Sequence, residues 1–196
     1  IGFVVVLMLG YLPVPDVCPC CGSTLVVRQS SGGIRQLYCE NEACPARLVR
    51  KFVHFCSKTR MEIKGLDEQT LTTFVQHGWV KNYGDLYELE QHRDEILETP
   101  GFGEKSFARF QKAVDERRTC TLNQFIAGLG IPEVGRHAGR ILSRKFGGSW
   151  EAFEQAILEQ FDFTQLEDFG QVMNDNIYNW YNDAEEAKLW RPALYH

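Results

Sequence analysis

The chain has 196 residues, 44% of them hydrophobic, which is enough for one large domain or two small ones with a real core. Its formal net charge of −5 excludes a protein that binds nucleic acid through an evenly basic surface. The longest unbroken apolar run, Phe3–Leu9, is far shorter than the ~20 residues that span a bilayer. The sequence therefore predicts no transmembrane helix, and we expect a cytoplasmic protein.

The charge is unevenly distributed along the chain. Residues 18–60 carry +5, from seven basic and two acidic side chains, and residues 151–196 carry −8, from two basic and ten acidic ones. Residues 61–150 are almost neutral, at −1. A neutral segment can hold a polyanion only when backbone amides make many of the contacts. Any DNA contact in this middle segment is therefore expected to come largely from the backbone.

Residues 1–15 are expected to form a strand followed by a linker. The β-branched valines within Phe3–Leu9 favour a strand. Pro13 and Pro15 then interrupt regular structure.

Two pairs of cysteines follow. Cys18 and Cys21 are separated by two residues, Cys39 and Cys44 by four, and 17 residues lie between the pairs. Four thiolates at this spacing are typical of a tetrahedral structural Zn²⁺ site. Two disulfides are the alternative, but nothing in the sequence suggests secretion. Cys20 lies beside the first pair and is able to compete for the metal.

The segment 16–58 is predicted to be a zinc finger with a short β-hairpin. Ser23–Arg28 and Ile34–Tyr38 have strand-like composition on either side of a glycine turn, and Ala46–Ser57 has the pattern of an amphipathic helix. The basic residues of this helix serve either as a solvated face or as phosphate contacts, and the sequence leaves both open. They are Arg47, Arg50 and Lys51.

The clearest functional motif is Pro100–Ser106. Gly101 and Gly103 flank Phe102 in a very short turn between two helical apolar patterns. Glycine permits positive φ and lets another molecule approach the backbone. The first amides of the following helix lack partners and lie at the positive end of the helix dipole, so they form a phosphate site that needs no basic side chain. A side chain at Gly103 is expected to strain this turn.

Three other stretches repeat the pattern in part. A repeat of this length indicates stacked supersecondary units. We therefore predict a mainly α fold, with four helix-hairpin-helix repeats over residues 59–186 and an exit linker at 187–196; four ordinary turns between helices are the alternative. The first glycine position is occupied by Gly65, Gly101, Glu133 and Asp168. The second is occupied by Asp67, Gly103, Gly135 and Gly170, at spacings of 36, 32 and 35 residues.

The candidate DNA contacts follow from this repeat. The turn with both glycines, Gly101–Lys105, should be the strongest phosphate site, and Gly135, which is followed by basic side chains, should be next. Asp67 and Asp168 put a carboxylate where a phosphate would approach, so their hairpins should serve mainly as packing units. The candidate set is Gly65, Gly101, Gly103, Glu104, Lys105, Gly135, Arg136, His137 and Gly170, with Arg47, Arg50 and Lys51 from the preceding helix.

A four-cysteine motif followed by four such hairpins resembles the C-terminal half of bacterial NAD-dependent DNA ligase. The resemblance covers about residues 13–195. It implies that Cys18, Cys21, Cys39 and Cys44 hold zinc, and that the turns grip the minor-groove side of nicked duplex DNA. The segments that carry it are Cys39–Ala46, His54-Phe55, Gly65-Leu66, Pro100–Ser106 and Leu129–Ile131.

The family adenylates a lysine from NAD, passes AMP to a 5′-phosphate and then joins the 3′-hydroxyl, in replication and repair. No Lys-x-Asp-Gly occurs in this sequence, so we expect no catalytic residue in this chain and no ligase activity from it alone. Zinc is the cofactor expected here, while NAD and Mg²⁺ would serve the full-length enzyme. By the same resemblance, residues 1–15 would be the end of the preceding oligonucleotide-binding barrel. We also expect the protein to be a monomer.

Two other classes of function remain compatible with the sequence. A subunit of another repair or recombination system could use hairpin pairs without ligase chemistry, although it would not need the zinc module. A zinc-ribbon adaptor would use the helices to bind a partner protein. Weak or salt-insensitive DNA binding would favour the adaptor.

Overall fold

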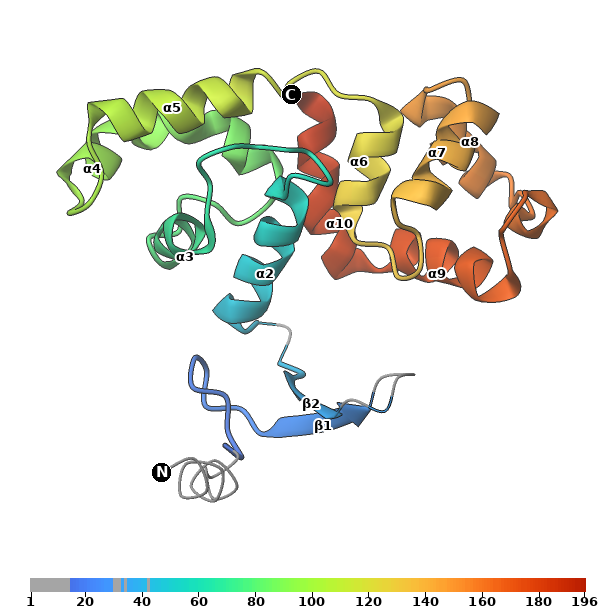
Figure 1. Ribbon diagram of the computed structural model, residues 1–196, viewed down its shortest axis with the longest axis horizontal. Helices are drawn as coiled ribbons and strands as arrows, with labels where there is room; N and C mark the ends of the chain where they lie inside the picture. Colours follow the sequence, from blue (N-terminus) through green and yellow to red (C-terminus); the bar gives the residue numbers. More distant parts are fainter. Residues whose placement is uncertain (1–14, 30–32, 34, 42) are drawn as a thin grey trace, which may run out of the picture. The chain divides into compact units, whose positions relative to one another are not determined.

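The computed structural model describes residues 15–29, 33, 35–41 and 43–196, which form two compact units, one ending at residue 47 and one beginning at residue 48 (Figure 1). The strand predicted at Phe3–Leu9 lies outside the described residues. The first unit contains β1 (Leu25–Gln29) and β2 (Arg35–Cys39), which pair antiparallel with Leu25 opposite Cys39. The pairing confirms the predicted two-stranded hairpin. It also brings the second cysteine pair back toward the first.

The second unit is entirely helical in its described residues, which confirms the predicted mainly α fold with strands only near the four cysteines. No helix in the described part of the chain is long and apolar enough to cross a membrane. The α-helices are α2 (Pro45–Cys56), α3 (Glu68–Gln76), α4 (Arg93–Glu98), α5 (Glu104–Asp115), α6 (Leu122–Leu129), α7 (Arg136–Lys145), α8 (Trp150–Leu158), α9 (Gln171–Asn182) and α10 (Ala184–Trp190). The 3₁₀ segments are η1 (Gly84–His92), η2 (Phe163–Gln165) and η3 (Arg191–Tyr195).

The apolar face of α2 belongs to the helical core. Phe52 and Phe55 are fully buried, and the Phe55 ring stacks on the Tyr83 ring with centroids 4.1 Å apart. The predicted domain boundary at residue 58 is therefore too late. The compact units divide at residue 47 because the helix that leaves the cysteine module places its aromatic side chains in the core of the second unit.

The C-terminal segment is packed, which corrects the prediction of an exit linker at 187–196. Leu189 and Trp190 are buried, and the Trp190 ring stacks on that of Trp180 at 4.9 Å. The Tyr83 amide also donates to the Leu189 carbonyl at 2.9 Å. Pro192 ends α10 without releasing the chain, because the 3₁₀ turn of η3 tolerates a proline in its first positions.

Candidate nucleic-acid interface and metal centre

The four predicted hairpin turns share one backbone conformation. In each, the residue at the first glycine position has a positive φ, although only two of the four are glycines. Non-glycine residues rarely adopt this conformation, so the shared geometry indicates a true structural repeat and not four unrelated turns. The φ values are 89° at Gly65, 93° at Gly101, 62° at Glu133 and 61° at Asp168.

The residue at the second glycine position is the N-cap of the helix that follows, in extended conformation, in all four hairpins. Asp67 caps α3 with its own side chain, which accepts from the Thr70 amide at 2.8 Å. That hydrogen bond holds the pKa of the Asp67 carboxyl below its usual range. The three glycine N-caps of α5, α7 and α9 offer no side chain to accept from the first-turn amides. The N-cap of the first hairpin therefore already supplies a carboxylate to its first-turn amides, and the other three N-caps do not.

The glycine N-caps are open to approach from outside. A Cβ atom built on Gly103, Gly135 or Gly170 meets no heavy atom within 4 Å. Because Gly103 has φ −155° and ψ 171°, the expected strain from a side chain there is absent. At Gly65, by contrast, a Cβ atom would lie 3.3 Å from Nε of Arg109. The first turn is packed against α5, and the N-caps of α5, α7 and α9 face open space.

The hairpins associate in two equivalent pairs. The first turn lies against Arg109, the sixth residue after the N-cap of α5. In the same way, the Pro132 carbonyl of the third turn accepts from Nδ2 of Asn176, at 3.0 Å, the sixth residue after the N-cap of α9. Nε2 of His137 also lies 2.8 Å from Oδ2 of Asp168, which links the third and fourth hairpins. The second and third hairpins each have an α-helix on both sides of the turn, whereas the first and fourth have irregular or 3₁₀ structure on one side. Each pair therefore combines one hairpin of each kind.

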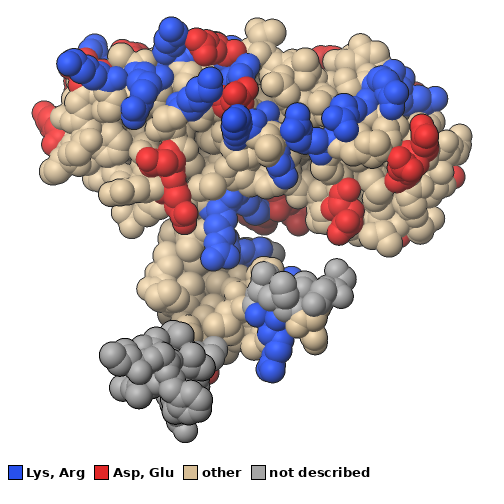
Figure 2. Space-filling model, viewed as in Figure 1, with Lys and Arg blue, Asp and Glu red and all other residues tan. Residues whose placement is uncertain are grey.

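The charged side chains near the open N-caps differ in whether they already form an ion pair within the protein. Glu104 forms an ion pair with Arg93 at 2.6 Å, whereas Lys105 and Arg136 are exposed. Neither Lys105 nor Arg136 pairs with a carboxylate of any described residue. Figure 2 shows Lys and Arg side chains gathered across the part of the helical unit that contains α5 and α7.

Of the three basic residues of α2 that were candidates for DNA contact, two interact with other groups of the protein. Arg47 donates to the Glu40 carbonyl at 2.9 Å, and Lys51 pairs with Glu186 at 2.5 Å. Arg50 is exposed. Arg47 and Lys51 therefore bind groups of the protein itself and are weaker candidates for DNA contact than Arg50.

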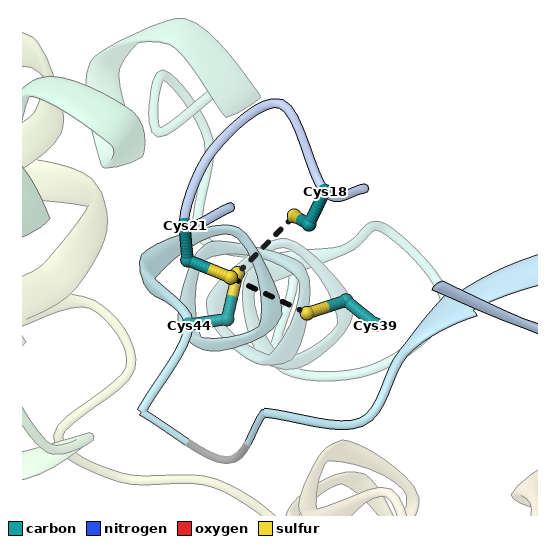
Figure 3. A group of neighbouring side chains, drawn as sticks. All are labelled: Cys18, Cys21, Cys39 and Cys44. Atoms are coloured by element: carbon teal, nitrogen blue, oxygen red, sulfur yellow. Dashed lines mark hydrogen bonds between the residues drawn. The ribbon is translucent and has the colours of Figure 1, made fainter. Parts of the chain in front are cut away.

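The four predicted metal ligands converge. The sulfurs of Cys18, Cys21, Cys39 and Cys44 all lie within 4.8 Å of one another, with Cys21 3.5 Å from Cys39 and Cys18 3.8 Å from Cys44 (Figure 3). A tetrahedral ion with metal–sulfur bonds of about 2.3 Å would place its four sulfurs about 3.8 Å apart. All seven cysteines are free in the structure, which favours the metal site over two disulfides, and Cys20 is exposed and outside the cluster. This group can hold a metal ion.

The surroundings of the four thiols favour different protonation states. The hydroxyl and amide of Ser23 hydrogen-bond to the Cys21 sulfur and lower its pKa to about 6. Burial raises the pKa of Cys44 to about 12, against the effect of the Arg47 and Ala46 amides at the start of α2. Burial likewise raises the pKa of Cys39. Metal binding at neutral pH must therefore displace protons from Cys39 and Cys44.

Sequence reasoning left out the basic face of α7. Arg140 and Arg144 are exposed and line a hollow with His137. The signal was present in the sequence, because Arg136–Lys145 contains four Lys or Arg residues and no acidic residue.

The fold and the site define a helix-hairpin-helix protein with a cluster of four thiols that can hold a metal ion. A family model described as a helix-hairpin-helix motif matches residues 124–189. The chain is 32% identical over 185 residues to a DNA ligase of Ruminiclostridium cellulolyticum, covering 94% of this chain and 28% of the ligase. It is 35% identical over 175 residues to a DNA ligase of Symbiobacterium thermophilum, covering 89% of this chain and 25% of that protein.

These matches confirm the resemblance to DNA ligase that was inferred from the motifs, and the chain corresponds to one part of those proteins. A DNA ligase of Methylacidiphilum infernorum, 35% identical over 176 residues and covering 89% of this chain and 24% of the ligase, agrees. The chain spans about a quarter of the length of these curated relatives.

Proposed function

We propose that this chain is the DNA-gripping portion of an NAD-dependent DNA ligase, and that it binds nicked duplex DNA without sequence preference. The observation that carries the proposal is the set of three glycine N-caps with open space beside them, at Gly103, Gly135 and Gly170. Amides at such helix ends bind phosphate oxygens, and phosphate contacts position a protein on DNA without reading its sequence.

The first hairpin plays a different part in this proposal. Asp67 occupies the position of an incoming phosphate at the start of α3, and Gly65 is packed against α5. This hairpin therefore supports its partner and does not grip DNA. Gly101–Lys105 is the main contact, because both its glycines are exposed and Lys105 follows them.

The cysteine cluster would hold Zn²⁺, because four thiolates at tetrahedral distances suit that ion. The ion would tie the β-hairpin to the start of α2 and supply most of the folding free energy of a unit with a small core. The chain contains no Lys-x-Asp-Gly, so it should neither become adenylated by NAD nor seal a nick by itself. The full-length ligase would supply the NAD and Mg²⁺ chemistry, in the cytoplasm, during replication and repair.

The test is a binding titration with labelled nicked duplexes of several sequences over a range of salt concentrations. We expect similar affinity for every sequence and a logarithmic salt slope of modest size, since each phosphate met by Lys or Arg adds about −0.9 and backbone contacts add less. A strong preference for one sequence would contradict the proposal. Binding that does not respond to salt would instead favour a protein-binding adaptor.

A further inference from the structure

The second and third hairpins carry equivalent hollows along their second helices. One is lined by residues at positions five, eight and nine after the N-cap of α5, and the other by residues at the same positions after the N-cap of α7. In both, the start of the preceding helix, α4 or α6, completes the wall. The shared positions are Ala108, Gln111 and Lys112 on α5, and Arg140, Ser143 and Arg144 on α7.

The α5 hollow, of about 660 Å³, is acidic. Its two cations are neutralised, because Arg93 pairs with Glu104 at 2.6 Å and Lys112 lies 3.9 Å from Glu116. Two further carboxylates line it, Glu90 and Asp115, of which Asp115 pairs with Arg118 at 3.0 Å. The lining therefore holds four carboxylates against two cations, which disfavours a polyanion.

The α7 hollow, of about 480 Å³, has the opposite charge. No carboxylate lines it, and neither Arg140 nor Arg144 forms an ion pair with any described residue. The rest of the lining can hydrogen-bond. It consists of Ser143 from α7, Thr121 and Asn123 from the start of α6, and His137, whose Nε2 lies 2.8 Å from Oδ2 of Asp168. Two unneutralised guanidinium groups beside neutral hydroxyl and amide groups suit a phosphate, since guanidinium binds its oxygens in bidentate fashion.

The distance along α7 separates this hollow from the open N-cap. Arg140 and Arg144 follow Gly135 by five and nine residues, which corresponds to about 7 and 13 Å along the helix axis. A single phosphate bound to the first-turn amides would not reach both arginines. The hollow is therefore placed to meet a different phosphate of the same duplex.

We infer that the α7 hollow, formed by Arg140, Ser143 and Arg144 against Thr121 and Asn123, binds a second phosphate of the DNA backbone. This inference rests on the proposed function and makes the third hairpin a two-point contact. The second hairpin, with its acidic hollow, holds DNA only at its N-terminal turn, through the first-turn amides and Lys105.

The experiment compares Arg140→Gln and Arg144→Gln with Lys112→Gln in the full chain. Lys112 occupies the position equivalent to Arg144 and loses the same charge, but it lies in the acidic hollow. A labelled nicked duplex of mixed sequence is titrated at several salt concentrations, with the melting temperature measured for each variant. We expect each α7 variant to bind about tenfold more weakly and to lose about 0.9 from the salt slope. Lys112→Gln should stay within about twofold of the unmodified chain.

Arg140→Lys and Arg144→Lys provide a second measurement. They keep the charge, so they should retain the salt slope while losing part of the affinity. If the unmodified chain binds DNA and both glutamine variants match Lys112→Gln, the α7 hollow is not a phosphate site and the proposed function stands. If the unmodified chain does not bind the duplex, both the proposed function and this inference are wrong.

Discussion

The imidazole Nε2 of His137 lies 2.8 Å from Oδ2 of Asp168, a residue 31 positions later in the sequence. Both side chains are about two-thirds exposed, at 63% each. The contact places a carboxylate beside the N-terminus of α7, so part of the positive potential at the third hairpin is offset by the turn of the fourth. Asp168 therefore weakens the proposed contact of the third hairpin with DNA.

Replacement of Asp168 by Asn should strengthen DNA binding several-fold. Asn has nearly the same shape and tolerates the left-handed backbone that Asp168 adopts at φ 61°, so the change removes a charge and little else. The matched control is Glu167→Gln, which removes the same charge from the neighbouring exposed residue. Binding to a nicked duplex at low salt measures the effect. Equal gains from both variants would show that only net charge matters.

The three glycine N-caps should differ in their sensitivity to alanine. Gly103→Ala should weaken binding most, by about tenfold or more, followed by Gly135→Ala and then Gly170→Ala. Because all three added methyl groups enter open space, the variants should melt within a few degrees of the unmodified chain. This separates lost contact from unfolding. Equal losses at all three positions would show that Glu133 and Asp168 do not affect DNA binding.

The left-handed turn positions should respond to substitution in opposite directions. Glu133→Gly should stabilise the protein by about 1 kcal/mol, because a side chain at φ 62° is strained and glycine is not. Gly101→Ala should destabilise it by a similar amount, since φ is 93° there. Gly103→Ala, two residues away in extended backbone, is the control for Gly101→Ala. Chemical denaturation gives the free energies of unfolding; a destabilised Glu133→Gly would mean that Glu133 makes a contact worth more than its backbone strain.

Freshly purified chain should contain one zinc ion. Cys39→Ser should lose the metal and unfold residues 18–45, because three thiolates leave the tetrahedral site incomplete. Cys20→Ser should retain the metal, since Cys20 is exposed and outside the cluster. Elemental analysis and amide exchange report the two effects. Metal-free protein with Cys18 and Cys21 joined in a disulfide would rule out the site.

The local sequence was sufficient to predict the cluster of four cysteines and the hairpin repeat. Cysteine spacing brings Cys18 toward Cys21 and Cys39 toward Cys44 through turns of a few residues, and the β-hairpin then joins the pairs. The turns could also be predicted from the sequence, because a helix N-terminus, a short turn and an N-cap depend on residues close together in the chain. The predicted extent of α2 agrees with the structure within one residue at each end for the same reason.

Contacts between distant residues were decided only by the tertiary structure. The sequence made Glu133 and Asp168 look like departures from the repeat, yet both adopt the left-handed conformation of glycine, because packing of the paired hairpins can outweigh about 1 kcal/mol of strain. The burial of Trp190 against Trp180 and the convergence of Arg140 and Arg144 in one hollow also depend on neighbouring helices. Local composition fixes the conformation of a turn or a helix, whereas which side chains meet across the fold depends on how those helices pack.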